Sequence, residues 1–518
     1  MNKTANLLKD AWISLVAGAA VGLIVAAFSA PPFGRAAFGA IVIAVLCSFG
    51  LIRAWRGLSG EKALAVIMIT AFLVRILLGI VIYQMLPTAG NGTPGELAGY
   101  VYSDAYERDT AAIQLAQSGG NILSSFLGQF KSDQYGGLLA VTALVYKAFS
   151  PDAARPLLIT LLAAFTSTVG LAFLWSALKG RFSRGFALAA TWLVALYPEG
   201  VLLGSSQMRE PFLIGLGCIA FWAAVEWKYD KLKAFLVFLG SVVGLVLFSA
   251  PAGMIIAGAC VALVVLEFTI TTQTQVNRWT GIEVLAIMGF AAVIAGWMWL
   301  QPTLYFSMYQ SVTGSGMLQA IFESAPEKLR ILFVTVYGLL QPVLPAAVTD
   351  FGRPFWTVVA ILRAAGWWLM LPFILYAFFA LWRKEKEENH WILILVGMLF
   401  LVWTIVSSAR AGGDQWDNPR YRAILLPWMA MVFAWVWLRV KEVNPVWFWR
   451  WVGVVGAITL GFTNWYLTRK FGIGLNMSFY SLVAWVGIAS VAILAGSLIW
   501  DFVHRPKRIK PAEDSQHG

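Results

Sequence analysis

Four charged residues lie within six positions, from Asp104 to Asp109, in a chain of 518 residues of which only 12% are charged. Long apolar runs on either side indicate that this cluster lies at a membrane face. A charge next to hydrocarbon must stay hydrated, be paired, or serve a function. The cluster predicts a site at which Asp104, with Asp109 as the alternative, faces a substrate carried by the membrane. The competing interpretation makes Asp104 a hydrated loop residue or a helix cap.

A second acidic candidate stands in the sequence MREPF, where Glu210 lies between Arg209 and Pro211. Its competing interpretation is structural, because an acid at a helix N-terminus favours the helix dipole and proline suits the first turn. Glu199 is a weaker candidate for the same role, because it also follows a proline near the end of an apolar run.

Basic candidates for phosphate binding occur in the sequence NPRYR, which holds Arg420, Tyr421 and Arg422. Arginine suits phosphate because its planar guanidinium can donate two parallel hydrogen bonds. Arginine is also common at the ends of membrane spans, where its side chain reaches the interface. Arg75 lies in the middle of an apolar run, so it requires a buried partner.

The elements that must position these residues are membrane helices. The chain is 59% hydrophobic, whereas soluble domains are roughly 45–50% apolar. A membrane-spanning helix needs roughly 20 apolar residues. About fourteen segments meet this requirement: 11–30, 36–55, 63–87, 156–178, 185–204, 210–227, 232–249, 252–268, 281–300, 355–382, 391–408, 423–438, 448–467 and 478–500. The predicted fold class is an all-α polytopic membrane protein with about fourteen transmembrane helices and juxtamembrane helices in two long outer-face loops.

The segment 137–150 determines the topology. It is apolar but too short to cross a bilayer, so we expect a juxtamembrane helix. If segment 137–150 does not cross the membrane, most basic loops lie on the cytoplasmic side, as the positive-inside rule requires. Arg469 and Lys470 are the exception. The outer face then carries loops 88–155 and 301–354, the second with an amphipathic helix near 325–340. The predicted divisions are an N-terminal transmembrane hairpin (1–60), a catalytic module (61–230), the remaining transmembrane helices (231–504) and a basic cytoplasmic tail (505–518).

Composition also excludes several classes of protein. The net charge of +12 does not indicate nucleic-acid binding, because the basic residues lie mainly in short loops between spans. All three cysteines lie inside apolar runs, which excludes a disulfide framework and a cysteine zinc site. Only three histidines are present, so a histidine-built metal site is not expected.

The order of these motifs resembles the GT-C superfamily of polytopic glycosyltransferases, the group of protein O-mannosyltransferases and lipid A aminoarabinose transferases. The resemblance rests on a span with a mid-membrane arginine, the stretch from Ser103 to Gly119, the segment YPEGVLLGSSQMREPFLIGLG and the later NPRYRAILLPW. The resemblance extends over roughly residues 62–230 and, less closely, over residues 410–440. One departure is Arg108, because many relatives carry an aromatic residue about four positions after the aspartate.

The resemblance implies a donor sugar on a polyprenyl phosphate and an inverting transfer to a hydroxyl at the non-cytoplasmic face of the cell membrane. Asp104 would be the general base, because an acceptor hydroxyl is a poor nucleophile until its proton is taken. Glu210 would order the site, hold the acceptor or share a divalent cation with Asp104. Arg209, Asp109 and the NPRYR residues would bind substrate. The acceptor, whether lipid, glycan or protein, stays open.

Two other functions are weighed against this one. A transporter or flippase would favour polar groups at mid-membrane and internal repeats. The acids here concentrate at one face, and no repeat is evident. A polysaccharide polymerase or ligase of the outer leaflet would rely on arginine and histidine in its outer loops, and the few histidines count against it.

Overall fold

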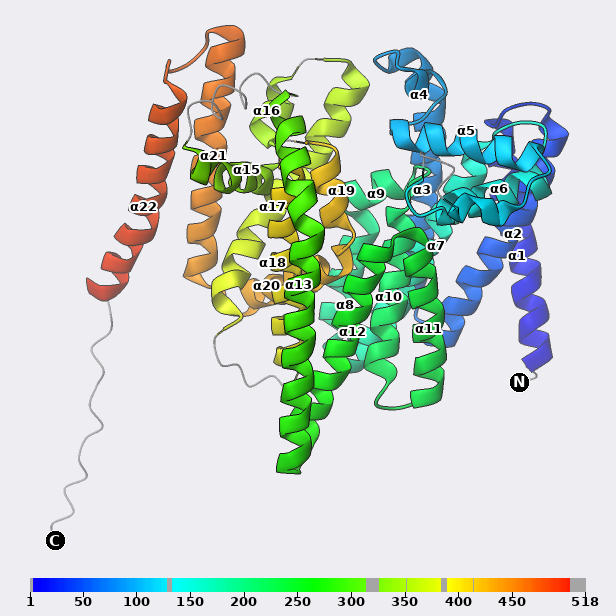
Figure 1. Cartoon of the computed structure of the whole chain (residues 1–518), viewed down its shortest axis with the longest axis horizontal. Coiled ribbons are helices and arrows are strands. Elements are labelled where there is room, and N and C mark those ends of the chain that lie inside the picture. The colour runs from blue at the N-terminus through cyan, green and yellow to red at the C-terminus, as the bar shows by residue number, and fades with distance from the viewer. Residues whose placement is uncertain are drawn as a thin grey trace.

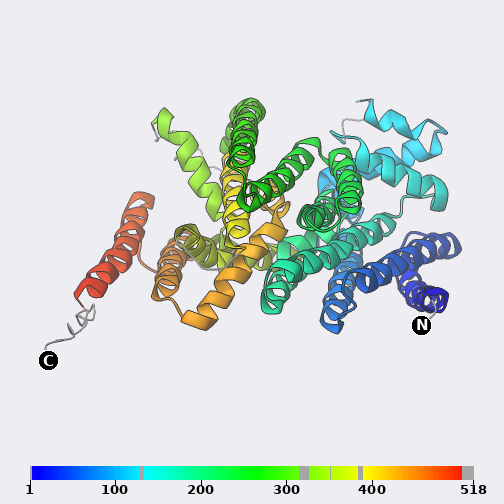
Figure 2. The ribbon, with the colours of Figure 1, turned by 90° about the horizontal axis from the view of Figure 1, so that it is seen from below.

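The computed structural model describes residues 3–127, 133–313, 326–350, 352–382, 389–412 and 414–503, and the predicted tail 505–518 lies outside them. These residues form helices joined by short connections, and no strand occurs among them. The chain is an all-helical polytopic membrane protein, as its composition predicts. Figure 2 shows an elongated helical assembly, with the first two helices at one end and the last helix at the other.

The helices of the first half are α1 (Lys3–Ala27), α2 (Phe33–Leu58), α3 (Lys62–Ala89), α4 (Pro94–Leu97), α5 (Ser103–Gln117), the 3₁₀ helix η1 (Ile122–Phe126), α6 (Gly137–Phe149), α7 (Pro156–Arg181), α8 (Arg184–Leu196), α9 (Pro198–Gly204), α10 (Glu210–Glu226) and α11 (Lys231–Phe248). Those of the second half are α12 (Ala250–Thr271), α13 (Gln275–Thr313), α15 (Glu327–Leu340), α16 (Leu344–Thr349), α17 (Pro354–Ala380), α18 (His390–Ala411), α19 (Asp417–Ala423), α20 (Leu426–Val443), α21 (Val446–Phe471) and α22 (Phe479–Val503).

Each predicted span coincides with a helix or a bent helix pair. Eleven helices in the described residues are long and apolar enough to cross a membrane. The pair α8 and α9, bent by 54°, and the pair α19 and α20, bent by 73°, raise the number to thirteen if each pair is one span. The fourteenth predicted segment, 210–227, is α10, whose 17 residues are shorter than the other spans.

The short helices gather at one end of the bundle. Figure 1 shows α5 and α6 lying across the direction of the long helices, at the end opposite to the start of α1. The orientation of α6, with its 13 residues, supports a juxtamembrane position for the predicted segment 137–150. The expected amphipathic helix near 325–340 is present as α15.

The helix before the second predicted loop extends beyond its membrane-crossing part. Loop 301–354 is predicted to follow a span ending at residue 300, and the part of α13 that is apolar enough to cross a membrane, Gln275–Met298, ends close to that position. The helix itself continues to Thr313 and has 39 residues. The helix passes through Pro302 without ending there. Membrane helices tolerate proline because neighbouring groups can satisfy the backbone carbonyl that the proline leaves without a donor.

Close packing of α7 against α10 places the first residues of α10. A Cβ atom on Gly215 would lie 2.0 Å from the carbonyl oxygen of Thr166, and one on Gly170 would lie 2.7 Å from the Cα atom of Gly215. Only glycine permits this approach of the two backbones, the small-residue packing common between membrane helices. Because α10 is held so closely, Glu210 at its N-terminus has a defined position.

The buried Arg75 side chain is hydrogen-bonded to the bent helix pair α8 and α9. It is 1% exposed, and its guanidinium donates hydrogen bonds to the carbonyl oxygens of Ala71, Val194 and Ala195. The last two carbonyls belong to the end of α8, where Pro198 interrupts the backbone hydrogen bonding of the span. The arginine therefore stabilises the break between α8 and α9, and its role is structural.

Candidate active site

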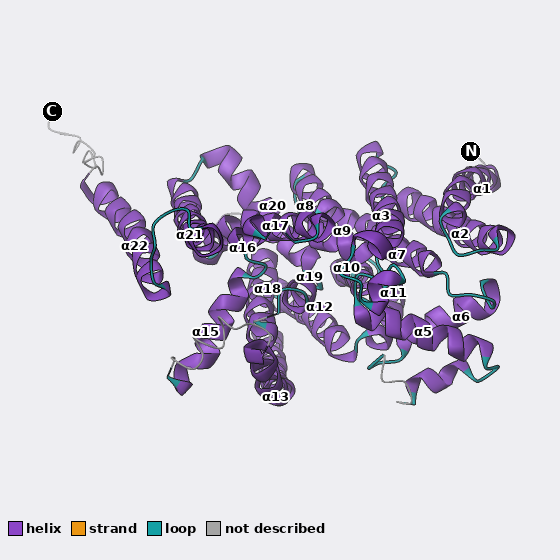
Figure 3. Cartoon of the chain, turned by 90° about the horizontal axis from the view of Figure 1, so that it is seen from above, coloured by secondary structure: helices purple, strands orange, loops and turns teal. Residues whose placement is uncertain are grey.

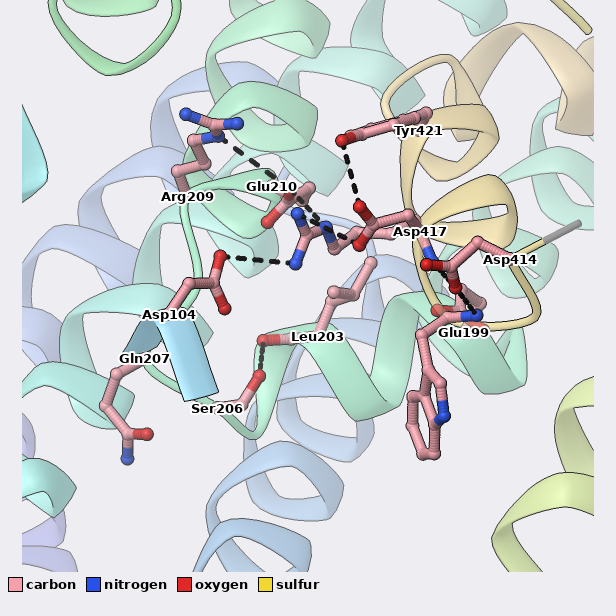
Figure 4. Close-up of polar contacts among 12 residues, drawn as sticks. Asp104, Glu199, Leu203, Ser206, Gln207, Arg209, Glu210, Asp414, Asp417 and Tyr421 are labelled. Atoms are coloured by element: carbon pink, nitrogen blue, oxygen red, sulfur yellow. Dashed lines mark hydrogen bonds and ion pairs between the residues drawn. The ribbon is translucent and has the colours of Figure 1, made fainter. Parts of the chain in front are cut away.

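Arg420 joins three carboxylates that come from three distant parts of the chain. Its Nη1 atom lies 3.3 Å from Oδ2 of Asp104, its Nε atom 3.2 Å from Oε1 of Glu210, and its Nη2 atom 3.3 Å from Oδ1 of Asp417. Figure 4 shows these carboxylates, from α5, α10 and α19, pointing toward one region. The structure therefore brings together Asp104, Glu210 and Arg420, which the sequence predicts separately, and adds Asp417.

The local structure sets the direction of each carboxylate. Tyr102 is the N-cap residue of α5, so Asp104 lies in the first turn of that helix. Glu210 begins α10 and is followed by Pro211, the arrangement expected of a helix start. Oδ1 of Asp414 accepts hydrogen bonds from the backbone N–H groups of Trp416 and Asp417, which orders the beginning of α19.

Two cavities adjoin the carboxylates that Arg420 contacts, and the larger one opens on the Asp104 side of Arg420. It has a volume of about 730 Å³ and lies between α4, α5, α16, α17 and α19. Asp104, Asp417 and Arg420 line it, and Trp356 and Trp416 form part of its aromatic wall. The side chain of Asp104 is 41% exposed, so a substrate in this cavity can reach its carboxylate.

The smaller cavity lies on the Glu210 side of Arg420. Its volume is about 30 Å³, and Arg209, Glu210, Tyr421, Arg410 and Ser249 are among its lining residues. Glu210 is 1% exposed and does not line the larger cavity. The predicted site residues thus divide between two cavities, with the Arg420 guanidinium in contact with a carboxylate of each.

Arg108 is a member of the site that sequence reasoning did not identify. It is 4% exposed, and its guanidinium lies 3.6 Å from Asp104 and 3.8 Å from Asp133 and donates to the carbonyl oxygen of Gln207. It therefore connects α5 with the loop before α10. The four-residue spacing from Asp104 was the available signal, because such a pair meets on one helix face.

Asp109 lies away from both cavities. It is 3% exposed and accepts hydrogen bonds from the hydroxyl groups of Tyr100 at 2.5 Å and Tyr146 at 2.6 Å. Burial raises the pKa of the Asp109 carboxyl from about 3.8 to about 6, although the two tyrosines and Arg108 act in the opposite direction. The hydrogen bond from Tyr146 to Asp109 therefore connects α6 with α5.

Arg422 also lies outside the two cavities. Its guanidinium stacks 3.7 Å above the ring of Trp367 and donates to the carbonyl oxygen of Gln341. Glu199 forms a buried bidentate pair with Arg363, with contacts of 2.6 and 3.0 Å. Arg363 lines the larger cavity, so Glu199 orients an arginine of its wall.

The carboxylates are not arranged as a metal site. In the described part of the chain, no three His, Cys, Asp or Glu residues are grouped so that they could hold a metal ion. The point at which Asp104, Glu210 and Asp417 converge is taken by the guanidinium of Arg420. These residues therefore do not fit a divalent cation in this arrangement, and the positive charge between them belongs to the protein itself.

Comparison with solved structures gives a distant likeness, whereas the other comparisons find nothing. No protein-family model matches the chain, and no curated protein matches it. The structure is similar to the archaeal oligosaccharyltransferase AglB from Archaeoglobus fulgidus, solved in complex with an inhibitory peptide and a dolichol-phosphate. The TM-score is 0.36 at 12% sequence identity, and the match covers 85% of this chain and 55% of that one. The chain thus matches about half the length of that enzyme.

Proposed function

We propose that the protein is a membrane glycosyltransferase that moves a sugar from a polyprenyl-phosphate donor to an acceptor hydroxyl at the non-cytoplasmic face. The observation that carries this proposal is the contact between Asp104 and Arg420 at the wall of the larger cavity. It places an accessible carboxylate beside a buried guanidinium. A general base and a cation are the two groups that sugar transfer from a phosphate requires.

In the proposed reaction, the acceptor hydroxyl lies in the larger cavity within reach of Asp104. The carboxylate takes the hydroxyl proton while the acceptor oxygen bonds to the anomeric carbon of the donor sugar. The bond between that carbon and the phosphate oxygen breaks, and the lipid phosphate leaves with the electron pair. Attack from the side opposite to the phosphate inverts the anomeric centre, and protonated Asp104 later releases its proton to water.

The arginines account for the charges in this reaction. The leaving phosphate gains negative charge as the sugar departs, so a guanidinium already held in place stabilises the transition state more than the ground state. Arg420 is held by Glu210 and Asp417, whereas Asp104 is also flanked by Arg108. Glu210 therefore acts as a positioning residue in this proposal, because it orders Arg420 from the far side.

The exposure of the two aspartates supports Asp104 as the base. Asp104 faces the larger cavity, whereas the carboxylate of Asp109 is enclosed by two tyrosine hydroxyl groups. An acceptor in the cavity can approach only the first of these carboxylates. The assignment of Asp109 to substrate binding in the sequence analysis is therefore replaced here by a role in positioning α5.

The test is transfer from a radiolabelled polyprenyl-phosphate sugar by membranes that contain Asp104→Asn. General-base contributions are typically 10²–10⁴-fold, so we expect transfer to fall at least a hundredfold while donor binding stays near the parent value. Glu107→Gln is the matched control, because Glu107 is an exposed acid on the same helix. Near-normal transfer by Asp104→Asn would remove the base from the proposal.

A further inference from the structure

The two oxygen atoms of the Asp104 carboxylate have different surroundings. Arg420 donates a hydrogen bond to Oδ2 at 3.3 Å, and Nη2 of Arg108 lies 3.6 Å from the same oxygen. Within the described ranges of the chain, no group donates a hydrogen bond to Oδ1. Figure 4 shows one oxygen of Asp104 joined by a dashed line, and the other oxygen without such a contact. Because Asp104 lines the larger cavity, Oδ1 is the oxygen that is left to receive a proton from a substrate.

Arg108 reaches this carboxylate from the interior of the protein. Its side chain is 5% exposed, and it is not among the lining residues of either cavity. Asp104 and Arg108 are four positions apart, so they lie on one face of α5. The guanidinium therefore contacts the exposed carboxylate of Asp104 without being reached by a substrate in the cavity.

Two groups hold Arg108 on its other side. It donates a hydrogen bond to the carbonyl oxygen of Gln207 at 3.1 Å, and its Nε atom lies 3.8 Å from Oδ2 of Asp133. The side-chain amide of Gln207 in turn donates to Oγ1 of Thr160 at 3.0 Å and to the carbonyl oxygen of Pro156 at 3.3 Å. Both acceptors lie at the start of α7, so the carbonyl group that receives Arg108 is fixed to that helix.

Asp133 also has a fixed position. Its side chain is 2% exposed, and its two oxygens accept hydrogen bonds from the backbone N–H groups of Tyr135 and Leu139, at 3.2 and 3.0 Å. Gly137, the first residue of α6, packs against the end of α11, because a Cβ atom there would lie 2.0 Å from the carbonyl oxygen of Leu247. Asp133 is therefore attached to the start of α6, and it limits where the guanidinium of Arg108 can lie.

The contact with Asp104 is not needed to attach Arg108. Asp133 and the carbonyl group of Gln207 already hold the guanidinium, and both residues are buried. An ion pair with a carboxylate that is 41% exposed adds little to stability, because water screens it. The effect of this contact is instead on Asp104, whose carboxylate would otherwise turn about its side-chain bonds with only Arg420 to direct it.

We propose that Arg108 is a positioning residue, which together with Arg420 binds Oδ2 of Asp104 and so directs Oδ1 toward the acceptor hydroxyl. This inference rests on the proposed function and deepens it, because it names the atom that takes the proton. The O–H bond of the acceptor breaks and its proton moves to Oδ1, while the acceptor oxygen bonds to the anomeric carbon. The bond from that carbon to the phosphate oxygen breaks, and its electron pair stays with the phosphate. Arg108 exchanges no proton and contacts no substrate.

The test is transfer from a radiolabelled polyprenyl-phosphate sugar by membranes that contain Arg108→Gln or Arg108→Lys, at a series of donor concentrations. We expect Arg108→Gln to lower the maximal rate per protein about 10–100-fold, because a reacting group displaced by about 1 Å can cost roughly a hundredfold. The KM for the donor should stay near the parent value, since a group that touches no substrate adds no ground-state binding. Arg108→Lys should recover part of the rate, because an ammonium group keeps the charge but lacks the planar fork of the guanidinium.

The double variant Arg108→Gln/Asp104→Asn separates positioning from other roles. If Arg108 acts only through Asp104, its loss should lower transfer less than about threefold further once residue 104 has no charge. Losses that multiply in the double variant would overturn the proposal, because they would show that Arg108 acts independently of the base.

Arg181→Gln is the matched control, because Arg181 is also a buried arginine that binds one carboxylate and one carbonyl group. Its guanidinium lies 2.8 Å from Glu267 and donates to the carbonyl oxygen of Val225. The helix α7 runs over 26 residues from Pro156, beside Gln207, to Arg181, so roughly 39 Å separate this control from the site. We expect folded Arg181→Gln to transfer like the parent.

A second variant keeps the test independent of folding. Arg108→Gln leaves the buried carboxylate of Asp133 without a cation, which can prevent folding. The double variant Arg108→Gln/Asp133→Asn removes both buried charges, and we expect it to lose transfer as Arg108→Gln does. Thermal unfolding in detergent shows that each preparation is folded before its rate is compared. A parent-like rate in this folded double variant would contradict the positioning role.

The outcomes separate this inference from the proposed function. A parent-like rate in Arg108→Gln, together with lost transfer in Asp104→Asn, would overturn this inference and leave Asp104 as the base. Near-normal transfer by Asp104→Asn would overturn both. A raised KM for the donor with an unchanged maximal rate would make Arg108 a substrate-binding group and would also overturn the positioning role.

Discussion

The carboxylate of Asp104 lies 3.3 Å from the guanidinium of Arg420, although 316 residues separate them in the chain. Asp104 sits in the first turn of α5, a helix that lies across the end of the bundle, whereas Arg420 belongs to the bent pair α19 and α20. Their contact requires both helices to be placed correctly, so it depends on most of the bundle. The first prediction concerns the consequences of breaking it.

Arg420→Gln should destabilise the protein and stop transfer. Glu210 is 1% exposed, and loss of Arg420 would leave its charge without its nearest partner, which costs about 3–5 kcal/mol for a buried pair. The double variant Arg420→Gln/Glu210→Gln should recover most of the stability, because it buries no unpaired charge, yet still transfer slowly. Thermal unfolding in detergent and transfer assays on the same preparations measure both effects. Transfer that returned together with stability would give Arg420 a structural role only.

Asp109 should make stability depend on pH in the acid range. Its folded pKa of about 6 lies above the ordinary value of about 3.8, so the folded state holds the proton more tightly. This stabilisation is complete below pH 4 and is lost as the pH rises through 6, a change of about 3 kcal/mol. Asp109→Asn should remove this loss, and Glu107→Gln should keep it. Unfolding temperatures between pH 4 and 7 test the prediction, and equal pH profiles for parent and Asp109→Asn would refute it.

Transfer should not depend on added divalent cations. The guanidinium of Arg420 already meets the three carboxylates that converge in the site. A metal ion would have to displace this arginine, which is held by three ion pairs. Transfer measured after treatment with a chelator, with and without added magnesium or manganese, should be equal. A rate that collapses with the chelator and returns with the metal would show that Arg420 moves away from the carboxylates in the working enzyme.

The topology predicts which positions share a side of the membrane. Ser118, after α5, and Gln415, before α19, are exposed at the end that carries the site, whereas Lys231 is exposed at the opposite end. Single cysteines at the first two positions should react with an impermeant reagent added outside cells. A cysteine at position 231 should react only after permeabilisation. The three native cysteines are buried and provide a low background. Reaction of Ser118→Cys and Gln415→Cys on opposite sides would contradict a juxtamembrane α6.

The helices were predictable because twenty apolar residues in a row leave few alternatives. Figure 3 shows the arrangement that hydropathy could not provide, namely which helices become neighbours. The apparent charge exception at Lys470 is an example, because its ammonium group pairs with Asp350 at 2.9 Å, from a distant loop. The positive-inside rule counts charges along the chain, so it cannot predict this ion pair.

The site was predictable only in part, for a related reason. Glu210 and Arg420 stand out in sequence because each is a charge at the end of an apolar segment, and Asp104 stands out because it lies in a cluster of four charges. Arg422 has the same sequence signal two positions away, yet the helix turns it toward Trp367. Residues two apart on a helix do not share a face, so adjacent candidates can have different surroundings. Which of them faces a cavity depends on packing between distant helices.

The hydrogen bonds of Arg75 also have a consequence for how the chain is made. This arginine lies in α3, but the carbonyl groups that accept from it are 119 and 120 residues later. At a synthesis rate of roughly 5–20 residues per second, Arg75 is made about 6–24 seconds before those acceptors exist. During that interval only the hydrogen bond of Arg75 to the carbonyl oxygen of Ala71, within α3, can form. The two hydrogen bonds from Arg75 in α3 to Val194 and Ala195 can therefore form only after α8 has been synthesised.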